Sequence, residues 1–145
     1  MSKSAILSRP RVVLVNRCII KNAKDKILVI RRSKYSSTRI GMWEFPGGKL
    51  DAGQDLSHAQ EREVLEETGL TILTTSRTSF VDGEILTQGK YAGLPYVIIF
   101  GQAKLVGGKV MLSKENDAYK WVTPKQALKL SITPESRKAL AVLYG

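Results

Sequence analysis

The feature that most constrains the fold of this chain is a capped helix with strand-like sequence on both sides. Residues 55–68 are predicted to be helical, because Asp55 is a residue type that caps helix starts and Gly69 is placed to end the helix in a left-handed conformation. The flanking segments are rich in branched apolar residues, which favour strands. A central helix between strands predicts a mixed α and β domain.

The other expected elements fill most of the 145 residues, as one domain. Residues 1–9 are expected to form a loose tail. Polar or glycine-containing stretches at 33–41 and 82–94 are expected to be loops. The predicted strands are 12–20, 27–32, 43–45, 70–81, 96–105, 110–112 and 119–122, and the predicted further helices are 125–130 and 134–143.

Charge and cysteine content limit the kind of partner and compartment. The formal net charge of +10 suggests an anionic partner, such as a nucleotide, a nucleic acid or a membrane surface, or else a solvated basic surface. No apolar run approaches the roughly 20 residues of a membrane span, so no membrane association is expected. Cys18 is the only cysteine and lies in an apolar stretch, which predicts a buried, inert thiol and a cytoplasmic protein.

The predicted central helix carries a cluster of acids. Glu63, Glu66 and Glu67 stand three and four residues apart, so their side chains fall on one face of the helix. Clustered like charges destabilise a helix, and a divalent cation is the natural compensation because hard cations take carboxylate oxygens. Arg62 flanks the acids and can orient one of them. The alternative is an exposed acidic face without a metal.

These residues match a known pattern. Gly48, Arg62-Glu63-Val64, Glu66-Glu67 and Gly69-Leu70 resemble the Nudix box, G-x5-E-x7-R-E-U-x-E-E-x-G-U with U apolar, at every specified position but one. The run from Trp43 to Lys49 and the pair Trp121-Val122 are also similar to that family. The resemblance implies one Nudix hydrolase domain over residues 1–145, an α/β/α sandwich with a mixed sheet.

The resemblance also implies a metal site. Glu63 and Glu67 look like the main ligands of Mg²⁺, with Mn²⁺ as a substitute, and Glu66 like a further or water-mediated ligand. The backbone carbonyl of Gly47 is similar to another ligand that the family uses. The departure is Gln54, where the family has glutamate; its amide oxygen could still accept a hydrogen bond from Arg62.

Other residues resemble the family's catalytic and phosphate-binding groups. Glu115 is similar to a distant carboxylate that acts as ligand or general base, with Asp117 as the fallback, although both could lie in a solvated turn. Arg32 resembles a phosphate-contacting arginine, or else is a surface charge. The residues expected to act in catalysis are therefore Glu66, Glu67, Glu115 and Arg62, and those expected to bind substrate are Arg32, Lys34, Lys49 and Tyr91.

The implied reaction is hydrolysis of a nucleoside diphosphate linked to another group. A nucleoside triphosphate, giving a nucleoside monophosphate and pyrophosphate, is the first choice, before a dinucleoside polyphosphate and a nucleotide sugar. The rival is a lapsed Nudix module that binds nucleotide or RNA, which Gln54 and the charge favour and the intact acids oppose. Tyr91 and Tyr96 could stack on a base or simply pack. Nucleic acid is not an expected partner, and a monomer or homodimer is expected.

Overall fold

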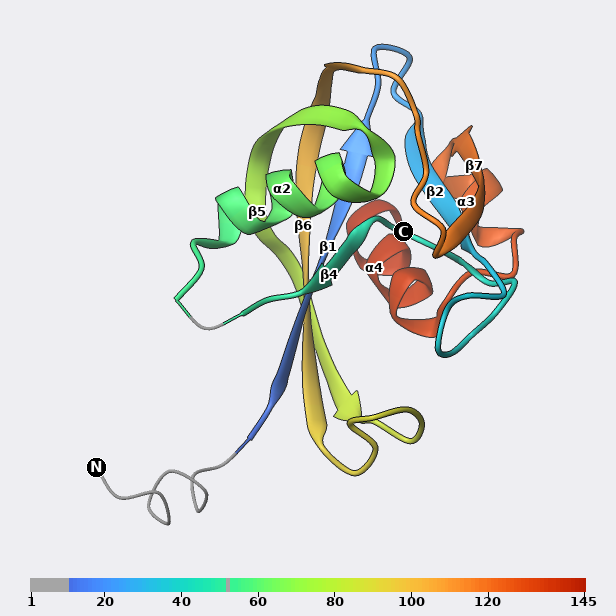
Figure 1. Cartoon of the computed structure of the whole chain (residues 1–145). Helices are drawn as coiled ribbons and strands as arrows, with labels where there is room; N and C mark the ends of the chain where they lie inside the picture. Colours follow the sequence, from blue (N-terminus) through green and yellow to red (C-terminus); the bar gives the residue numbers. More distant parts are fainter. Residues whose placement is uncertain (1–10, 52) are drawn as a thin grey trace.

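The sheet that organises this protein has seven strands and carries helices on both faces (Figure 1). The computed structural model describes residues 11–51 and 53–145, so the expected tail at 1–9 lies outside the described residues. The strands are β1 (Val13–Lys21), β2 (Ile27–Arg32), β3 (Trp43–Glu44), β4 (Gly47–Lys49), β5 (Leu70–Ile85), β6 (Pro95–Gly108) and β7 (Asn116–Val122). The helices are α2 (Leu56–Thr68), α3 (Pro124–Leu128) and α4 (Pro134–Tyr144).

The sheet is mixed, with the main strand order β3-β2-β1-β6-β5. β1 runs parallel to β6, and the other pairings are antiparallel; β4 pairs with β1 and β7 pairs with β2. Helix α2 covers one face through Val64, while α3 and α4 cover the other through Ala127 and Leu140. This α+β sandwich with a mixed sheet confirms the expected fold class.

Helix α2 forms as its local sequence predicts. The carboxylate of Asp55 accepts a hydrogen bond from the backbone N–H of His58 at 3.2 Å, which satisfies a donor at the open end of the helix. Gly69 ends it at φ +74°, in the left-handed region that suits glycine. Ala59, Val64 and Thr68 are buried against the sheet. The predicted helix at 55–68 is confirmed, with Asp55 as its cap.

The segment at 110–112 is not the strand that was predicted. Its backbone groups bond to the end of α2 instead: Met111 N–H donates to the carbonyl of Thr68 at 2.8 Å, and Ser113 N–H to the carbonyl of Glu67 at 3.1 Å. The last carbonyls of a helix lack partners inside it, so this extended segment supplies them. The segment therefore fixes the end of α2 that carries Glu67.

Strand β4 (Gly47–Lys49), which pairs with β1, was not predicted, and the remaining differences are at element boundaries. β5 continues beyond the predicted end at 81 to Ile85, because its pairing with β6 extends to Pro95, and the predicted 82–94 loop is shorter. β7 begins earlier than the predicted 119, and α3 ends at Leu128, before the predicted 130. Cys18 is buried, and burial raises its pKa to about 12, as an inert thiol requires. Across the described residues, no helix combines the length and apolarity that a membrane crossing needs.

Candidate active site

The acidic end of α2 lies against the turn that leads into β4. Gly47 N–H donates to Oε2 of Glu67 at 3.1 Å. A Cβ added to Gly48 would lie 2.9 Å from Oε2 of Glu63, so any other residue here would displace this carboxylate. Glu63 and Glu67 both line a cavity of about 600 Å³, together with Gly47 and Gly48. The glycines thus let the backbone approach the two acids closely.

Glu67 is the acid whose titration the fold changes most. Burial raises its pKa to about 7, and the nearby charges of Glu44 and Glu63 act in the same direction. The charge of Arg17 and the hydrogen bond from Gly47 oppose this shift, but they do not cancel it. A partly desolvated carboxylate beside other acids is the environment in which a bound cation would be most stabilising.

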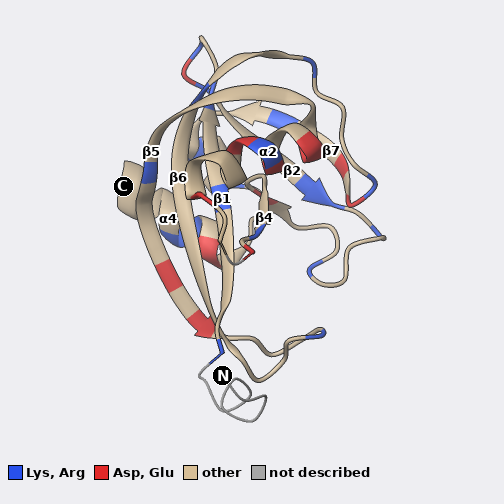
Figure 2. Ribbon diagram, turned by 60° about the vertical axis from the view of Figure 1, so that its left-hand side comes forward, with Lys and Arg blue, Asp and Glu red and all other residues tan. Residues whose placement is uncertain are grey.

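Arg62 and Glu66 lie at the outer edge of this acidic face. Arg62 Nη2 is 3.3 Å from Oε1 of Glu63, and its Nε is 3.6 Å from Oε1 of Glu66. The side chain of Glu66 is 61% exposed, against 19% for Glu63. Arg62 thus contacts both acids, whereas Glu66 is mostly exposed and is not among the residues that line the cavity. Figure 2 shows the acidic and basic residues side by side along α2.

The donors at this place suit a hard divalent cation. No three Asp, Glu, His or Cys side chains among residues 11–51 and 53–145 are grouped closely enough to hold a metal by themselves. Glu63, Glu67 and Gly47 do line the same cavity, where they offer two carboxylates and a backbone carbonyl as donors. Oxygen donors of this kind, completed by water or phosphate oxygens, are the usual ligands of Mg²⁺.

The same cavity brings together residues that are far apart in sequence. Glu115, Lys49 and Tyr91 line the same cavity as Glu63 and Glu67. Lys49 Nζ is 3.0 Å from the Tyr91 hydroxyl and 4.3 Å from its ring centre. Lys49 lowers the pKa of the Tyr91 hydroxyl through this contact.

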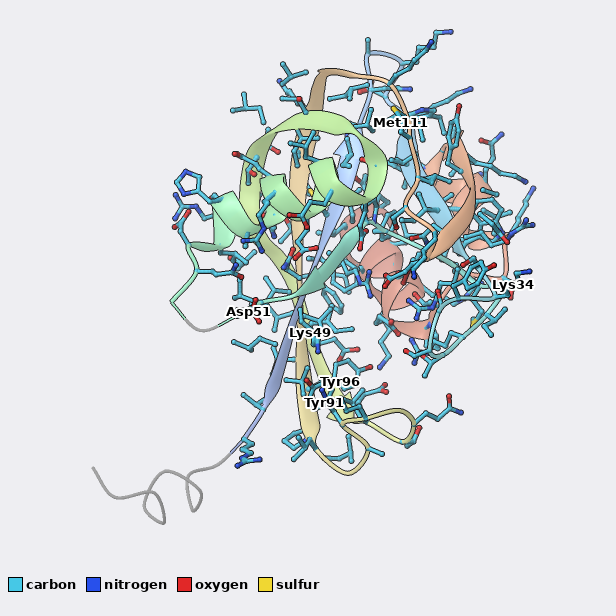
Figure 3. The ribbon with its side chains drawn as sticks, in the orientation of Figure 1. Lys34, Lys49, Asp51, Tyr91, Tyr96 and Met111 are labelled. Atoms are coloured by element: carbon cyan, nitrogen blue, oxygen red, sulfur yellow. The ribbon has the colours of Figure 1, made fainter. Side chains whose placement is uncertain are left out.

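Lys34 and Asp117 lie elsewhere. Figure 3 shows Lys34 at the right-hand edge of the view, away from Lys49 and Tyr91, and its ammonium lies 5.2 Å from the centre of the Tyr35 ring. Asp117 forms an exposed ion pair with Arg31 at 2.7 Å. Of the two acids in this segment, the structure thus brings Glu115 to the cavity.

Gln54 makes a different contact from the expected one. Its Oε1 accepts the backbone N–H of Asp51 at 3.0 Å, while Arg62 is engaged by Glu63 and Glu66. The expectation that Gln54 braces Arg62 is therefore corrected: the amide closes the turn before α2. The reason is local, since residues 51 and 54 stand at turn spacing, three apart.

A largely buried charge cluster lines the cavity and joins Arg32, which was expected at the site, to Arg17 and Glu44, which were not. Arg17 Nη2 is 3.4 Å from Oε1 of Glu44, and Arg32 Nη1 donates to both oxygens of Glu44 at 2.9 and 3.1 Å. Burial alone would lower the pKa of Arg17, but Glu44 and more distant acids outweigh it and raise that pKa. A signal was present, since Arg17 lies between Val15 and Ile19 on the inward-facing positions of a strand.

A second cavity of about 360 Å³ adjoins the first. Arg39 in the β2–β3 loop donates to the carboxylate of Glu135 in α4 at 2.6 Å, and both residues line this cavity. Sequence reasoning missed this pair, because nothing local links residues 96 positions apart. The residues that line both cavities are Val15, Arg17, Arg32, Thr38, Glu44, Leu86 and Gln88.

The cavity lined by Glu63 and Glu67 of α2, next to the turn at Gly47 and Gly48, suits metal-assisted hydrolysis. The NUDIX domain family profile matches residues 11–143, and the chain belongs to this family. The expected family membership is thereby confirmed, and with it the expectation of an enzyme that hydrolyses diphosphate bonds.

Relatives agree with this membership. A Bacillus subtilis protein with a proposed 8-oxo-dGTP diphosphatase activity is 29% identical over 128 residues, which cover 84% of this chain and 73% of that protein. The 8-oxo-dGTP diphosphatase of one Buchnera aphidicola strain is 44% identical over 55 residues, 38% of this chain and 40% of its own. The crystal structure of a MutT protein from Methanosarcina mazei is 29% identical, covers 93% of this chain and 94% of its own, and gives a TM-score of 0.78.

Proposed function

We propose that this protein hydrolyses a nucleoside triphosphate to a nucleoside monophosphate and pyrophosphate, with Mg²⁺ or Mn²⁺ as cofactor. The observation that carries the proposal is the pair of adjoining cavities. One contains Glu63 and Glu67, and the other is walled by Leu86, Tyr96 and Ile98 and carries Glu135. Acids at one end and a partly apolar chamber at the other suit a molecule with a polyphosphate and a base.

Each group has a role in this reaction. A divalent cation held by Glu63, Glu67 and the Gly47 carbonyl would offset the charge of the phosphate oxygens and make a nearby water more acidic. Glu115, which lines the same cavity, is our proposed acceptor for the proton of the attacking water. The water oxygen forms a bond to phosphorus, the bridging P–O bond breaks, and pyrophosphate leaves. Lys49 and Arg32 would hold non-bridging oxygens.

The second cavity would receive the base. Arg39 occupies only part of the hydrogen-bonding capacity of Glu135, since a carboxylate offers about four lone-pair sites. The carboxylate can therefore accept from an exocyclic amino group, which guanine, adenine and cytosine carry and thymine lacks. Because relatives are named for 8-oxo-dGTP, that nucleotide is the first substrate to test.

The test is a panel of 8-oxo-dGTP, the four common deoxynucleoside triphosphates, a dinucleoside polyphosphate and a nucleotide sugar, each with Mg²⁺, with Mn²⁺ and with chelator. We expect metal-dependent release of pyrophosphate from a triphosphate. Faster cleavage of the dinucleoside polyphosphate or nucleotide sugar would refute the substrate class, and nucleotide binding without turnover of any compound would indicate a lapsed site.

A pair of variants on the same helix tests the assignment of the acids. Glu67→Gln should lower turnover at least about 100-fold with the fold intact, because the phosphate charge loses its counterion. Glu61→Gln is the matched control, since the Glu61 carboxylate contacts Thr74 of β5 at 3.4 Å instead of the cavity. Equal losses in both variants would contradict the proposed site.

A further inference from the structure

Arg17 is a cation placed where an apolar residue would be expected. It lies on the β1 face that packs towards α4, in the row that contains Val15 and Ile19. Its side chain is 15% exposed, and it lines both cavities. A charge in such a row costs free energy unless other groups compensate it, so its partners indicate its role.

Those partners hold the guanidinium in a fixed position. Nη1 donates to the carbonyl of Phe45 at 3.3 Å and to the carbonyl of Gly47 at 3.4 Å, while Nη2 is paired with Glu44. The contacts come from the chain on either side of Pro46, directly before the cavity glycines. Arg17 thus has its geometry set before any ligand arrives.

The charge of this cluster is not balanced within it. Glu44 is the carboxylate that both Arg17 and Arg32 contact, and its side chain is only 7% exposed. Two guanidiniums sharing one carboxylate leave a surplus of one positive charge. Glu67, Glu135 and Glu63 contribute negative charge nearby. Glu135 is paired with Arg39, and a cation bound to Glu63 and Glu67 would neutralise their charge, so the surplus would then face the ligand cavities.

We propose that Arg17 is a second phosphate-binding arginine, which contacts a phosphate group of the ligand where the two cavities join, and that Glu44 limits the strength of this anion site. This inference rests on the proposed function, because the junction matters only if base and phosphates occupy different cavities. Arg32 and Arg17 approach the junction from neighbouring strands, β2 and β1. Glu44 keeps both in place and, by sharing its charge, prevents the phosphate product from binding too tightly.

The proposal predicts opposite effects for two neutralising substitutions. The probe is inorganic pyrophosphate, titrated calorimetrically with Mg²⁺ and again with chelator. Arg17→Gln should weaken pyrophosphate binding at least about tenfold, whereas Glu44→Gln should tighten it several-fold, because the amide still accepts hydrogen bonds but no longer offsets the arginines. Arg17→Lys should retain most of the affinity, since it keeps the charge.

Matched controls come from an ion pair on the same sheet. Arg31 and Asp117 form an exposed pair with side chains 42% and 48% exposed, so Arg31→Gln and Asp117→Asn change the net charge equally without touching the junction. Neither should alter pyrophosphate affinity more than about twofold. Thermal unfolding of each variant separates loss of fold from loss of binding.

A purely structural role for Arg17 and Glu44 makes a different prediction. Both substitutions would then lower the melting temperature and weaken pyrophosphate binding together, and that outcome would overturn the proposal, as would unchanged affinity in Arg17→Gln. If Arg17→Gln fails to fold, two results still distinguish phosphate binding from a purely structural role. They are the direction of the change in affinity in Glu44→Gln and the retention of binding in Arg17→Lys. The pyrophosphate titration measures binding and needs no turnover. A failure of this inference can therefore be told apart from a failure to find a triphosphate that the protein hydrolyses.

Discussion

The carboxyl group of Glu67 titrates differently in the folded protein and in the unfolded chain. Burial raises its pKa from 4.5 to about 7, so the folded state holds the proton more tightly. Between these values the folded protein binds more protons than the unfolded chain, so the free energy of unfolding must fall as the pH rises. With chelator present, we expect this residue to contribute a fall of about 3 kcal/mol at most between those pH values.

Denaturant unfolding of the wild type and of Glu67→Gln, from pH 4 to pH 8 in chelator, measures that contribution. The stability difference between the two proteins should change across this range, because other titrating groups are common to both. Mg²⁺ should reduce the wild-type fall, since the cation binds the deprotonated carboxylate. Parallel stability curves in chelator would show that the pKa of Glu67 is not raised.

Gln54 shows how a single departure from a pattern depends on its contacts. From the sequence alone, a neutral residue at this position is expected to hold Arg62 less firmly than a carboxylate would, and so to weaken the site beside it. In the structure Arg62 contacts Glu63 and Glu66, and Gln54 accepts from the backbone of Asp51. We therefore expect Gln54→Glu to shift the Mg²⁺ concentration for half-maximal rate by less than about fivefold, as for an exposed charge.

Steady-state kinetics across a Mg²⁺ titration checks this expectation. A much lower Mg²⁺ requirement in Gln54→Glu would mean that the added carboxylate does reach Arg62 in solution. A large rise in the requirement would instead indicate crowding by Asp51 and Asp55, which stand nearby in the sequence. Either result would contradict the role in the turn that the contacts assign to Gln54.

At the scale of elements, the contact between the C-terminal end of α2 and the segment at 109–113 holds the backbone of Glu67 in place. Gly69 has φ +74°, and a Cβ there would lie 2.8 Å from the carbonyl of Lys109, in the segment that caps the helix. Gly53 has φ +81° with open space around it. Gly53→Ala should therefore cost about 1 kcal/mol from backbone strain alone, and Gly69→Ala about 2–4 kcal/mol because a clash adds to the strain.

Chemical denaturation of the two alanine variants separates these contributions. We also expect Gly69→Ala to reduce turnover, because movement of the 109–113 segment releases the carbonyls of Thr68 and Glu67. Gly53→Ala should leave turnover close to wild type. Equal destabilisation by both substitutions would mean that the 109–113 segment moves away from the added methyl group of Gly69→Ala with no loss of stability.

At the scale of the whole molecule, the second cavity is built from parts that only the complete fold brings together. Arg39 comes from the β2–β3 loop, Glu135 comes from α4, 96 residues further along the chain, and Tyr96 comes from β6. Glu135→Gln should lower kcat/KM for dGTP, dATP and dCTP at least about tenfold, with little effect on dTTP, because the acceptor for an amino group loses its charge.

Arg39→Gln is the matched control for this prediction. It breaks the same ion pair but leaves the carboxylate of Glu135 in place, so the preference for bases with an amino group should survive. Measurement of kcat/KM for the four nucleotides in both variants distinguishes base recognition from simple loss of the pair. A uniform decrease in both variants for all nucleotides would show that the pair only supports the fold.

Local sequence was sufficient for the elements whose signals are local. The bounds of helix α2 were predicted correctly, except that Asp55 caps the helix instead of forming its first turn, because Asp55 and Gly69 mark its two ends. Strand β2 was predicted at its observed bounds, Ile27–Arg32. The segment at 110–112 was predicted wrongly, because a short apolar run resembles a strand whether its backbone pairs with a sheet or with a helix end. Which carbonyl accepts from a given backbone N–H depends on the tertiary structure, so the local sequence does not reveal it.

For the site, the sequence by itself determined the acidic face of α2 and the glycine turn before it, because helix periodicity and glycine's conformational freedom act over a few residues. Only the tertiary structure decided that Glu115 and Tyr91 meet those acids, that Gln54 closes a turn, and that Glu66 faces solvent. It also decided the charge cluster of Arg17, Glu44 and Arg32 and the pair of Arg39 with Glu135. These contacts depend on strand pairing and burial, which act between residues far apart in the chain and leave no periodic trace in its sequence.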